Sequence, residues 1–372
     1  MSPWFWFIGW SFVTIAWSPL TTVSFAQWLG LLALLLMAQA IRDRLRTPVC
    51  AHPGAWTAPR LSPHSVVSCL YFITTTYSLA VLVVHFLAPE LSGLDRSISI
   101  DGSNGLVHPT AAGATGSLGL VLVLNRFFHH RQGASAGTAV ALLIHLGILV
   151  LSNSRSALAT IAAVSMIFFI WATTKPTKAT AMVLLGVFCF AILVLDPGLE
   201  LINIVFGDVS SYIQRGQSID QLKAVSGRSE IWAAVWEQYL DAPIVGHGYF
   251  VTSADGQLDV WDGPANHDAH NVALQVLVST GLIGMLLFSW SVLAAWIHTV
   301  KLMWSHKDFT EGMEKVPFFL LVVSAWFAIW SQGCVTFLGP IRPESVVFFC
   351  LLGVTLGLQR STDLGWRGGE VE

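Results

Sequence analysis

Apolar residues occur in this chain as long continuous runs that are separated by shorter polar segments. A membrane-crossing helix needs about 20 predominantly apolar residues. Ten runs come near or above that length, the first and fifth being short: 4–18, 22–41, 66–88, 107–125, 137–152, 156–174, 179–195, 270–300, 316–338 and 344–359. Because apolar and polar residues do not alternate within the runs, the pattern disfavours a transmembrane β-barrel and predicts helices.

The composition places these helices in a membrane. Hydrophobic residues make up 54% of the 372-residue chain and charged residues 11%, whereas a soluble domain usually has about 25% charged residues. We therefore predict an all-α polytopic membrane protein with about ten transmembrane helices. Seven lie in residues 1–195 and three in residues 270–372, which end in a cytoplasmic tail, and a large polar loop at 196–269 separates the two groups. No cleavable signal peptide is expected, because Met1 leads into apolar sequence without a basic start.

The charged residues predict an orientation. Cytoplasmic loops of membrane proteins are enriched in lysine and arginine. With the N-terminus inside, six of the 19 Lys and Arg residues lie outside: Arg96, Arg155, Arg215, Lys223, Arg228 and Arg342. This bias predicts that both termini are cytoplasmic and that the large loop is on the outer face. With a net charge of −3 and no basic run, no nucleic-acid partner is expected. The five cysteines stand singly, and we interpret them as packing residues.

The large loop at 196–269 is predicted to be structured. It is too rich in apolar and aromatic residues for a disordered linker, and a loop of this length is typically functional or disordered. Ser226 is a suitable N-cap for a helix over about 228–240. One face of that helix is expected to lie on the bilayer interface through Trp232, Trp236 and Tyr239. Gly246-His247-Gly248 then predicts a tight turn.

Two of the five arginines predicted on the outer face, against the usual charge bias, are candidates for a functional role. Arg155 stands in a short polar segment between two apolar runs, where the alternative to a functional role is a snorkelling side chain in a turn. Arg228 falls in the first turn of the predicted loop helix, where the helix dipole disfavours a cation. A cation at that position favours a shared anion such as phosphate, and the alternative is a solvated loop arginine.

His270-Asn271 stands where the polar loop meets the eighth apolar run. A neutral imidazole there can act as a general base toward water-borne and lipid-borne substrates, and Asn271 can orient it or bind a substrate hydroxyl. A satisfied interfacial histidine is the simpler alternative. Gly281, about three helical turns further on, is expected on the same face. Together with Gly284 it would let a neighbouring helix approach closely.

These residues resemble the O-antigen ligase-like membrane proteins, a family that also includes O-antigen and exopolysaccharide polymerases. The strongest match is His270-Asn271-x9-Gly281-x-x-Gly284. The second is Gly227-Arg228-Ser229-Glu230-Ile231-Trp232, which is similar to the family's Gly-Arg-x-x-Ile-Trp and continues through Pro243 to the glycine turn at 246–248.

Two further motifs extend the resemblance over most of residues 11–290. They are Ser154-Arg155-Ser156, which opens a span, and Trp17-Ser18-Pro19, which is similar to the family's Trp-Ser-x-x-Pro turn. Family members usually have about twelve spans, and that turn follows the third. Here it follows the first, so we expect an N-terminal pair of spans to be lacking, a change that preserves orientation.

The resemblance implies a metal-independent, inverting glycosyltransferase of the GT-C type in the bacterial inner membrane, active on the periplasmic face and without a cofactor. Its donor would be a glycan on undecaprenyl pyrophosphate. Its acceptor would be a hydroxyl of a second lipid-anchored glycan, as in lipopolysaccharide assembly. The implied roles are His270 as base and Arg228 and Arg155 as pyrophosphate ligands. Residues beside them are expected to bind substrate: Asn271, Trp232 and His247.

Three alternatives stay open. A polysaccharide polymerase would share the donor and the motifs and differ only in its acceptor. A membrane transporter would usually carry ionisable residues near mid-membrane, and none of Asp, Glu, Lys or Arg falls in the middle of a predicted span. A metal-dependent enzyme could use outer acidic residues such as Asp95 and Asp101. A metal site could also be built from His267, His270, Asp262 and Asp268. This segment precedes the predicted helix, so the spacing of these residues defines no ligand geometry, and no metal site is predicted.

Overall fold

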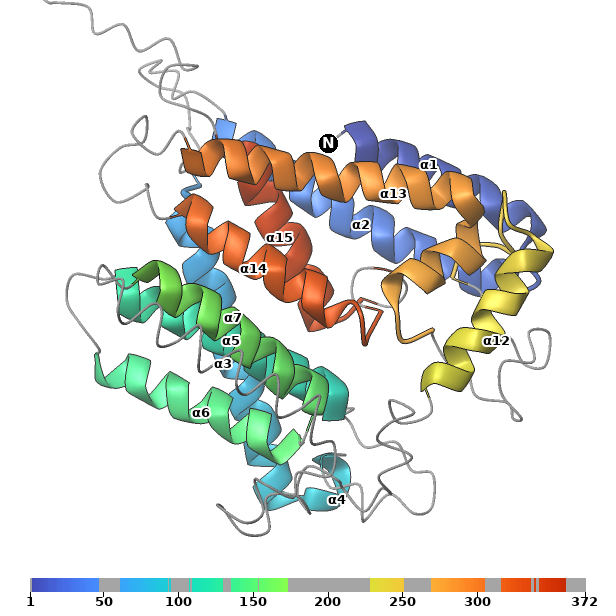
Figure 1. Cartoon of the computed structure of the whole chain (residues 1–372). Coiled ribbons are helices and arrows are strands. Elements are labelled where there is room, and N and C mark those ends of the chain that lie inside the picture. Colours follow the sequence, from blue (N-terminus) through green and yellow to red (C-terminus); the bar gives the residue numbers. More distant parts are fainter. Residues whose placement is uncertain are drawn as a thin grey trace, which may run out of the picture.

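The fold was analysed in a computed structural model of the whole chain (Figure 1). The structure describes residues 2–46, 61–92, 94, 107, 109–129, 135–152, 154–172, 228–250, 269–304, 316–335, 338 and 341–358. The regular secondary structure of these residues is entirely helical, which confirms the predicted all-α class.

The helices coincide with the apolar runs. The predicted seventh run, 179–195, and most of the large loop lie outside the described residues. The elements are α1 (Ser2–Thr14), the 3₁₀ turn η1 (Ile15–Trp17), α2 (Thr21–Arg46), α3 (Pro63–Leu87), α4 (Pro89–Ser92), α5 (Pro109–His129), α6 (Ala136–Ser152), α7 (Arg155–Ala172), α12 (Arg228–Asp241), α13 (Val272–Trp304), α14 (Val316–Trp330) and α15 (Pro343–Gly357).

Three of the described helices, α2, α3 and α13, are long and apolar enough to cross a membrane. Four shorter apolar helices accompany them, in α6, α7, α14 and α15. Large apolar side chains are exposed along the outside of the bundle, for example Phe72 and Phe86 on α3 and Leu286 on α13. A surface of this kind needs lipid rather than water around it, so the fold is that of a membrane protein. The span count of ten stays a prediction.

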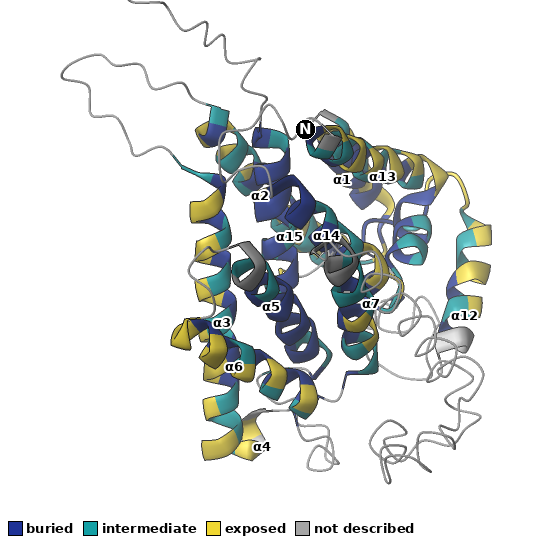
Figure 2. Cartoon of the chain, turned by 60° about the vertical axis from the view of Figure 1, so that its left-hand side comes forward, coloured by how far each residue is buried: buried dark blue, intermediate teal, exposed yellow. Residues whose placement is uncertain are grey.

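Helix α5 lies in the interior of the bundle, as its dark blue ribbon shows in Figure 2. Small residues make this position possible. A Cβ atom added to Gly116 would lie 3.2 Å from the backbone oxygen of His145 on α6, and one added to Gly119 would overlap the His145 ring. Such close backbone approach is the usual function of glycine between membrane helices.

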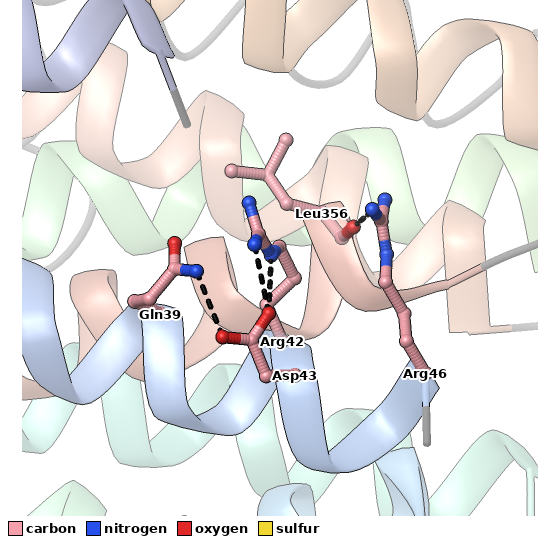
Figure 3. A network of polar contacts seen from close by, with 5 residues as sticks. All are labelled: Gln39, Arg42, Asp43, Arg46 and Leu356. Carbon is pink, nitrogen blue, oxygen red and sulfur yellow. Dashed lines mark hydrogen bonds and ion pairs between the residues drawn. The ribbon is translucent and has the colours of Figure 1, made fainter. Parts of the chain in front are cut away.

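The C-terminal ends of α2 and α15 are joined by a polar network (Figure 3). Arg46 donates to the backbone oxygen of Leu356, which satisfies a carbonyl in the last turn of α15. Arg42 forms an ion pair with Asp43 at 2.7 Å, and Gln39 donates to the same carboxylate at 2.8 Å. Of these contacts only the Arg46 bond crosses from α2 to α15, because Gln39, Arg42 and Asp43 all belong to α2.

Candidate functional site

The candidate site is built around a break in α13. Gly281 has φ 66° and ψ −170°, a combination that is essentially restricted to glycine. It divides the helix into a short first part from Val272 to Thr280 and a long second part from Leu282 onward. A break of this kind leaves N–H groups without partners on one side and carbonyl groups on the other.

The turn after α12 supplies those partners. The N–H groups of Leu282 and Ile283 donate to the oxygens of Pro243 and Ile244, at 2.8 and 3.3 Å. In the opposite direction, the turn donates two hydrogen bonds to carbonyl groups of the first part of the helix. The His247 N–H donates to Val278 O and the Gly248 N–H donates to Ser279 O, both at 2.9 Å. The segment 243–248, here called the docked turn, is therefore hydrogen-bonded into the break (Figure 1).

The motif glycines are explained by this docking. A Cβ atom on Gly281 would overlap the backbone of Ile244, and one on Gly246, which has φ 71°, would lie 2.6 Å from the Ser279 oxygen. The prediction that Gly281 continues a straight helix on the face of His270 is therefore wrong, because the chain changes direction there. The neighbour at Gly281 is the docked turn, whereas Gly284 packs against Trp10 of α1.

The N-terminal motif packs on the same junction. Trp17 Nε1 donates to Gly246 O at 2.9 Å, and Trp10 Nε1 donates to Thr280 O at 2.9 Å. A Cβ atom on Gly248, which has φ 114°, would lie 2.5 Å from the Ser18 Cβ. Three of the four sequence motifs thus meet where α13 is broken, although they are far apart in the chain.

His270 lies at the start of the first part of α13 and is half-buried. Its φ of 49° is in the left-handed region, which a non-glycine residue seldom occupies. The preceding residue, Ala269, is fully buried. Its N–H donates to Gln275 Oε1 at 3.1 Å, and its oxygen accepts from Trp232 Nε1 at 3.1 Å.

Asn271 caps the helix. Its Oδ1 accepts the Leu274 N–H at 3.2 Å, which is the bond that an N-cap asparagine makes. Its Nδ2 lies 3.5 Å from Gln332 O, and the next residue, Val272, donates its N–H to Ser331 O at 3.0 Å. The end of α14 is thereby fastened beside His270.

Helix α12 begins at Arg228 and confirms the helix predicted at about 228–240. Its buried residues Ile231 and Val235 pack against Ala269 and Val278. The predicted interfacial face is corrected, because the Trp232 indole points to Ala269 O rather than outward. Trp236, 47% exposed, does lie on the outside. Ser226, the predicted N-cap, is outside the described residues.

The predicted His247 is held by its own neighbourhood. Its ring Nε2–H donates to Gln238 O on α12 at 2.6 Å, and its backbone N–H bonds to α13. His247 therefore joins the two helices, and its predicted contact with substrate stays a prediction.

Arg155 is the half-buried first residue of α7. Three contacts connect the region of Arg155 to that of His270. The Val272 N–H of α13 donates to Ser331 O at the end of α14. Trp326 of α14 donates to Ser117 of α5 at 3.2 Å, and Gly113 of α5 packs on Ser154, which precedes Arg155. These contacts place the start of α7 at the end of the bundle that carries His270. The convergence of Arg155 and Arg228 on His270 stays a prediction; Arg228 is the first residue of α12.

Sequence reasoning missed Trp10, Gln275, Ser331 and Gln332. Only Gln275 had a visible signal, as an amide inside an apolar run. The residues considered for metal binding, His267, Asp262, Asp268, Asp95 and Asp101, lie outside the described residues. Among the described ones, no group of three or more His, Cys, Asp or Glu side chains gathers.

Comparison with known proteins gave one family. Residues 140–289 match the family model described as O-antigen ligase. That segment contains Arg155, Arg228 and His270 with the docked turn and both motif glycines of α13. No curated protein matches the chain. Over residues 140–289 the chain is therefore similar to the O-antigen ligase family.

Proposed function

We propose that this protein is a glycosyltransferase that moves a glycan from an undecaprenyl-pyrophosphate carrier to a hydroxyl of a lipid-anchored acceptor. The observation that carries the proposal is the junction at Gly281, where three sequence motifs pack together and present His270 at the end of an apolar helix bundle. The family match supports the ligase or polymerase class.

In the proposed reaction His270 takes the proton from the acceptor hydroxyl. The oxygen then forms a bond to the anomeric carbon of the donor, and the bond from that carbon to the pyrophosphate breaks with inversion. The carrier leaves as undecaprenyl pyrophosphate. A positioned base contributes about 10²–10⁴ in rate to such a step.

Arg155 and Arg228 are proposed to bind the pyrophosphate. Negative charge grows on the leaving oxygen, and a guanidinium can neutralise it through two parallel hydrogen bonds. In a site that excludes water, such fixed charges lower the barrier more than they do in solution. This proposal assigns the charge-neutralising role to arginines instead of a divalent ion.

An apolar cavity supports a lipid-borne substrate. It lies between α13, α14 and α15 and has a volume of about 220 Å³. Val272 and Gln332 line the end beside His270, and Thr299 and Thr355 line the other end. Aromatic side chains form its middle: Phe288, Trp296, Phe327 and Phe348. We propose that it accommodates part of a substrate's hydrocarbon chain while the head group lies near His270 on the periplasmic face.

Reconstitution in vesicles tests the proposed function. The protein is supplied with an undecaprenyl-pyrophosphate glycan and two competing acceptors, a lipid A core and a second lipid-linked glycan, and products are resolved by mass. A single addition to the core acceptor is expected for a ligase, and a ladder of products would identify the polymerase alternative. Intact donor with both acceptors, in protein that is folded, would contradict the transferase.

A further inference from the structure

His270 is held in a conformation that its own backbone disfavours. A left-handed φ on a residue with a side chain is strained and persists only when the surroundings impose it. We propose that Gln275 and Trp232 are positioning residues, which clamp the two backbone polar groups of Ala269 and thereby hold His270 in its left-handed conformation. This inference rests on the proposed function, in which His270 is the base.

The clamp acts on the peptide plane that precedes His270. Trp232 Nε1 binds the Ala269 oxygen at 3.1 Å, and that oxygen belongs to the plane whose nitrogen is His270 N. Gln275 Oε1 binds the Ala269 N–H at 3.1 Å, which fixes the preceding plane as well. Because peptide groups are planar, one hydrogen bond on each side of the buried Ala269 leaves the two adjoining peptide planes little freedom to rotate.

The chain is fixed on the other side of His270 too. Asn271 O accepts the Gln275 N–H at 3.0 Å, and Asn271 Oδ1 caps the Leu274 N–H. The φ angle of His270 is one of the few backbone rotations between these two fixed parts. Gln275 contributes to both, through its side chain before His270 and through its backbone after it.

Gln275 is itself immobilised. Its side chain is 1% exposed, and its Nε2 donates to Ser279 Oγ at 3.0 Å. Burying an amide in an apolar helix is costly unless its donor and acceptor are both bonded, and here both are. Trp232 comes from α12, one helical turn after Arg228, so the clamp also ties the helix that begins with Arg228 to His270.

Steady-state kinetics of reconstituted protein test the clamp. Gln275→Met removes the acceptor for Ala269 N–H, and Trp232→Phe removes the donor to Ala269 O. Both are expected to lower kcat about 10-fold or more, since a misplaced catalytic group loses rate, with donor KM within about 2-fold. Gln275→Glu keeps a side-chain oxygen and is expected to restore most of kcat.

Thr280→Val is the matched control, because it removes another buried hydrogen bond of the same helix segment, from Thr280 Oγ1 to Val276 O. It is expected to leave kcat within about 2-fold. An equal loss in this control would overturn the clamp, as would a failure of Gln275→Glu to restore kcat. A rise in KM at constant kcat for Trp232→Phe would assign that indole to substrate binding instead.

Hydrogen exchange at the Ala269 and His270 amides provides a second measurement that needs no activity. Exchange there is expected to be about 10-fold faster in Gln275→Met than in the parent and unchanged in Thr280→Val. Unchanged exchange in Gln275→Met contradicts the clamp. If exchange at these amides is faster in Gln275→Met than in the parent, and the parent nevertheless transfers no glycan, the proposed function is wrong while the clamp is supported.

Discussion

Substituting Gly281 by alanine should dismantle the junction that holds the site together. The residue sits at φ 66° and ψ −170°, where a side chain costs about 1–3 kcal/mol in backbone strain. The added Cβ would also overlap the backbone of Ile244. Since two backbones cannot share that space, either the docked turn leaves the break or α13 straightens.

The size of the effect follows from the hydrogen bonds at risk. Four backbone bonds join the docked turn to α13, and each contributes about 1 kcal/mol net. Loss of all four amounts to roughly 4 kcal/mol, of which about 1 kcal/mol is recovered from the better helix propensity of alanine. Glycosyl transfer should fall at least 100-fold, because α12 and the short helical part that follows His270 lose their connection.

The assay combines thermal unfolding in detergent with transfer activity in vesicles. Gly147→Ala is the matched control, because Gly147 lies in α6 and its added Cβ would meet only Leu82 side-chain carbons at 3.7 Å, an ordinary contact. The control should keep parental Tm and activity. Parental Tm and activity in Gly281→Ala would refute the reasoning that the break organises the site.

Three further predictions address the chemistry. Arg228→Lys should lower transfer strongly, by about 10-fold or more, because a point charge does not replace a planar fork; parental rates would argue against pyrophosphate binding by this residue. Activity should survive EDTA, and a loss that Mn²⁺ or Mg²⁺ restores would refute the metal-free mechanism. Ala295→Trp fills the cavity between α13, α14 and α15 and should impair transfer from a long-chain donor more than from a short-chain analogue. The control Leu293→Trp, on the exposed face of α13, should affect transfer from neither donor. Equal rates with both donors in Ala295→Trp would show that the cavity does not bind the donor chain.

The helices themselves could be predicted from the sequence. Apolar runs are local features, and the six from 4–18 to 156–174 correspond to α1, α2, α3, α5, α6 and α7 in the structure. The helix over residues 228–240 was also predictable, because its cap and aromatic spacing are local. Its orientation was not, since the Trp232 indole is directed by Ala269 O, 37 residues away.

The break in α13 could not be predicted from the run that contains it. Residues 270–300 are continuously apolar, and a glycine in such a run is typical of close helix packing. Gly281 adopts its non-helical angles because the docked turn supplies hydrogen-bond partners from residues 243–248. That pairing depends on tertiary contacts, which also decide the left-handed conformation of His270 and the fastening of Asn271 to α14.

The motifs were nevertheless visible before their contacts were. The spacing from His270 to Gly281 and Gly284 marked the right segment, and the structure gives its physical basis: His270 and Gly281 flank the two ends of one short helical part. The convergence of the Arg155 and Arg228 side chains on that part stays a proposal.

The central claim is that His270 acts as the base in glycosyl transfer from a lipid pyrophosphate. Its most direct test is the single-turnover rate of donor consumption in vesicles for the parent and for His270→Ala, with both proteins matched in Tm. A loss of about 10²–10⁴ in this rate is expected for His270→Ala, with donor affinity unchanged. A rate within a few-fold of the parent would contradict it.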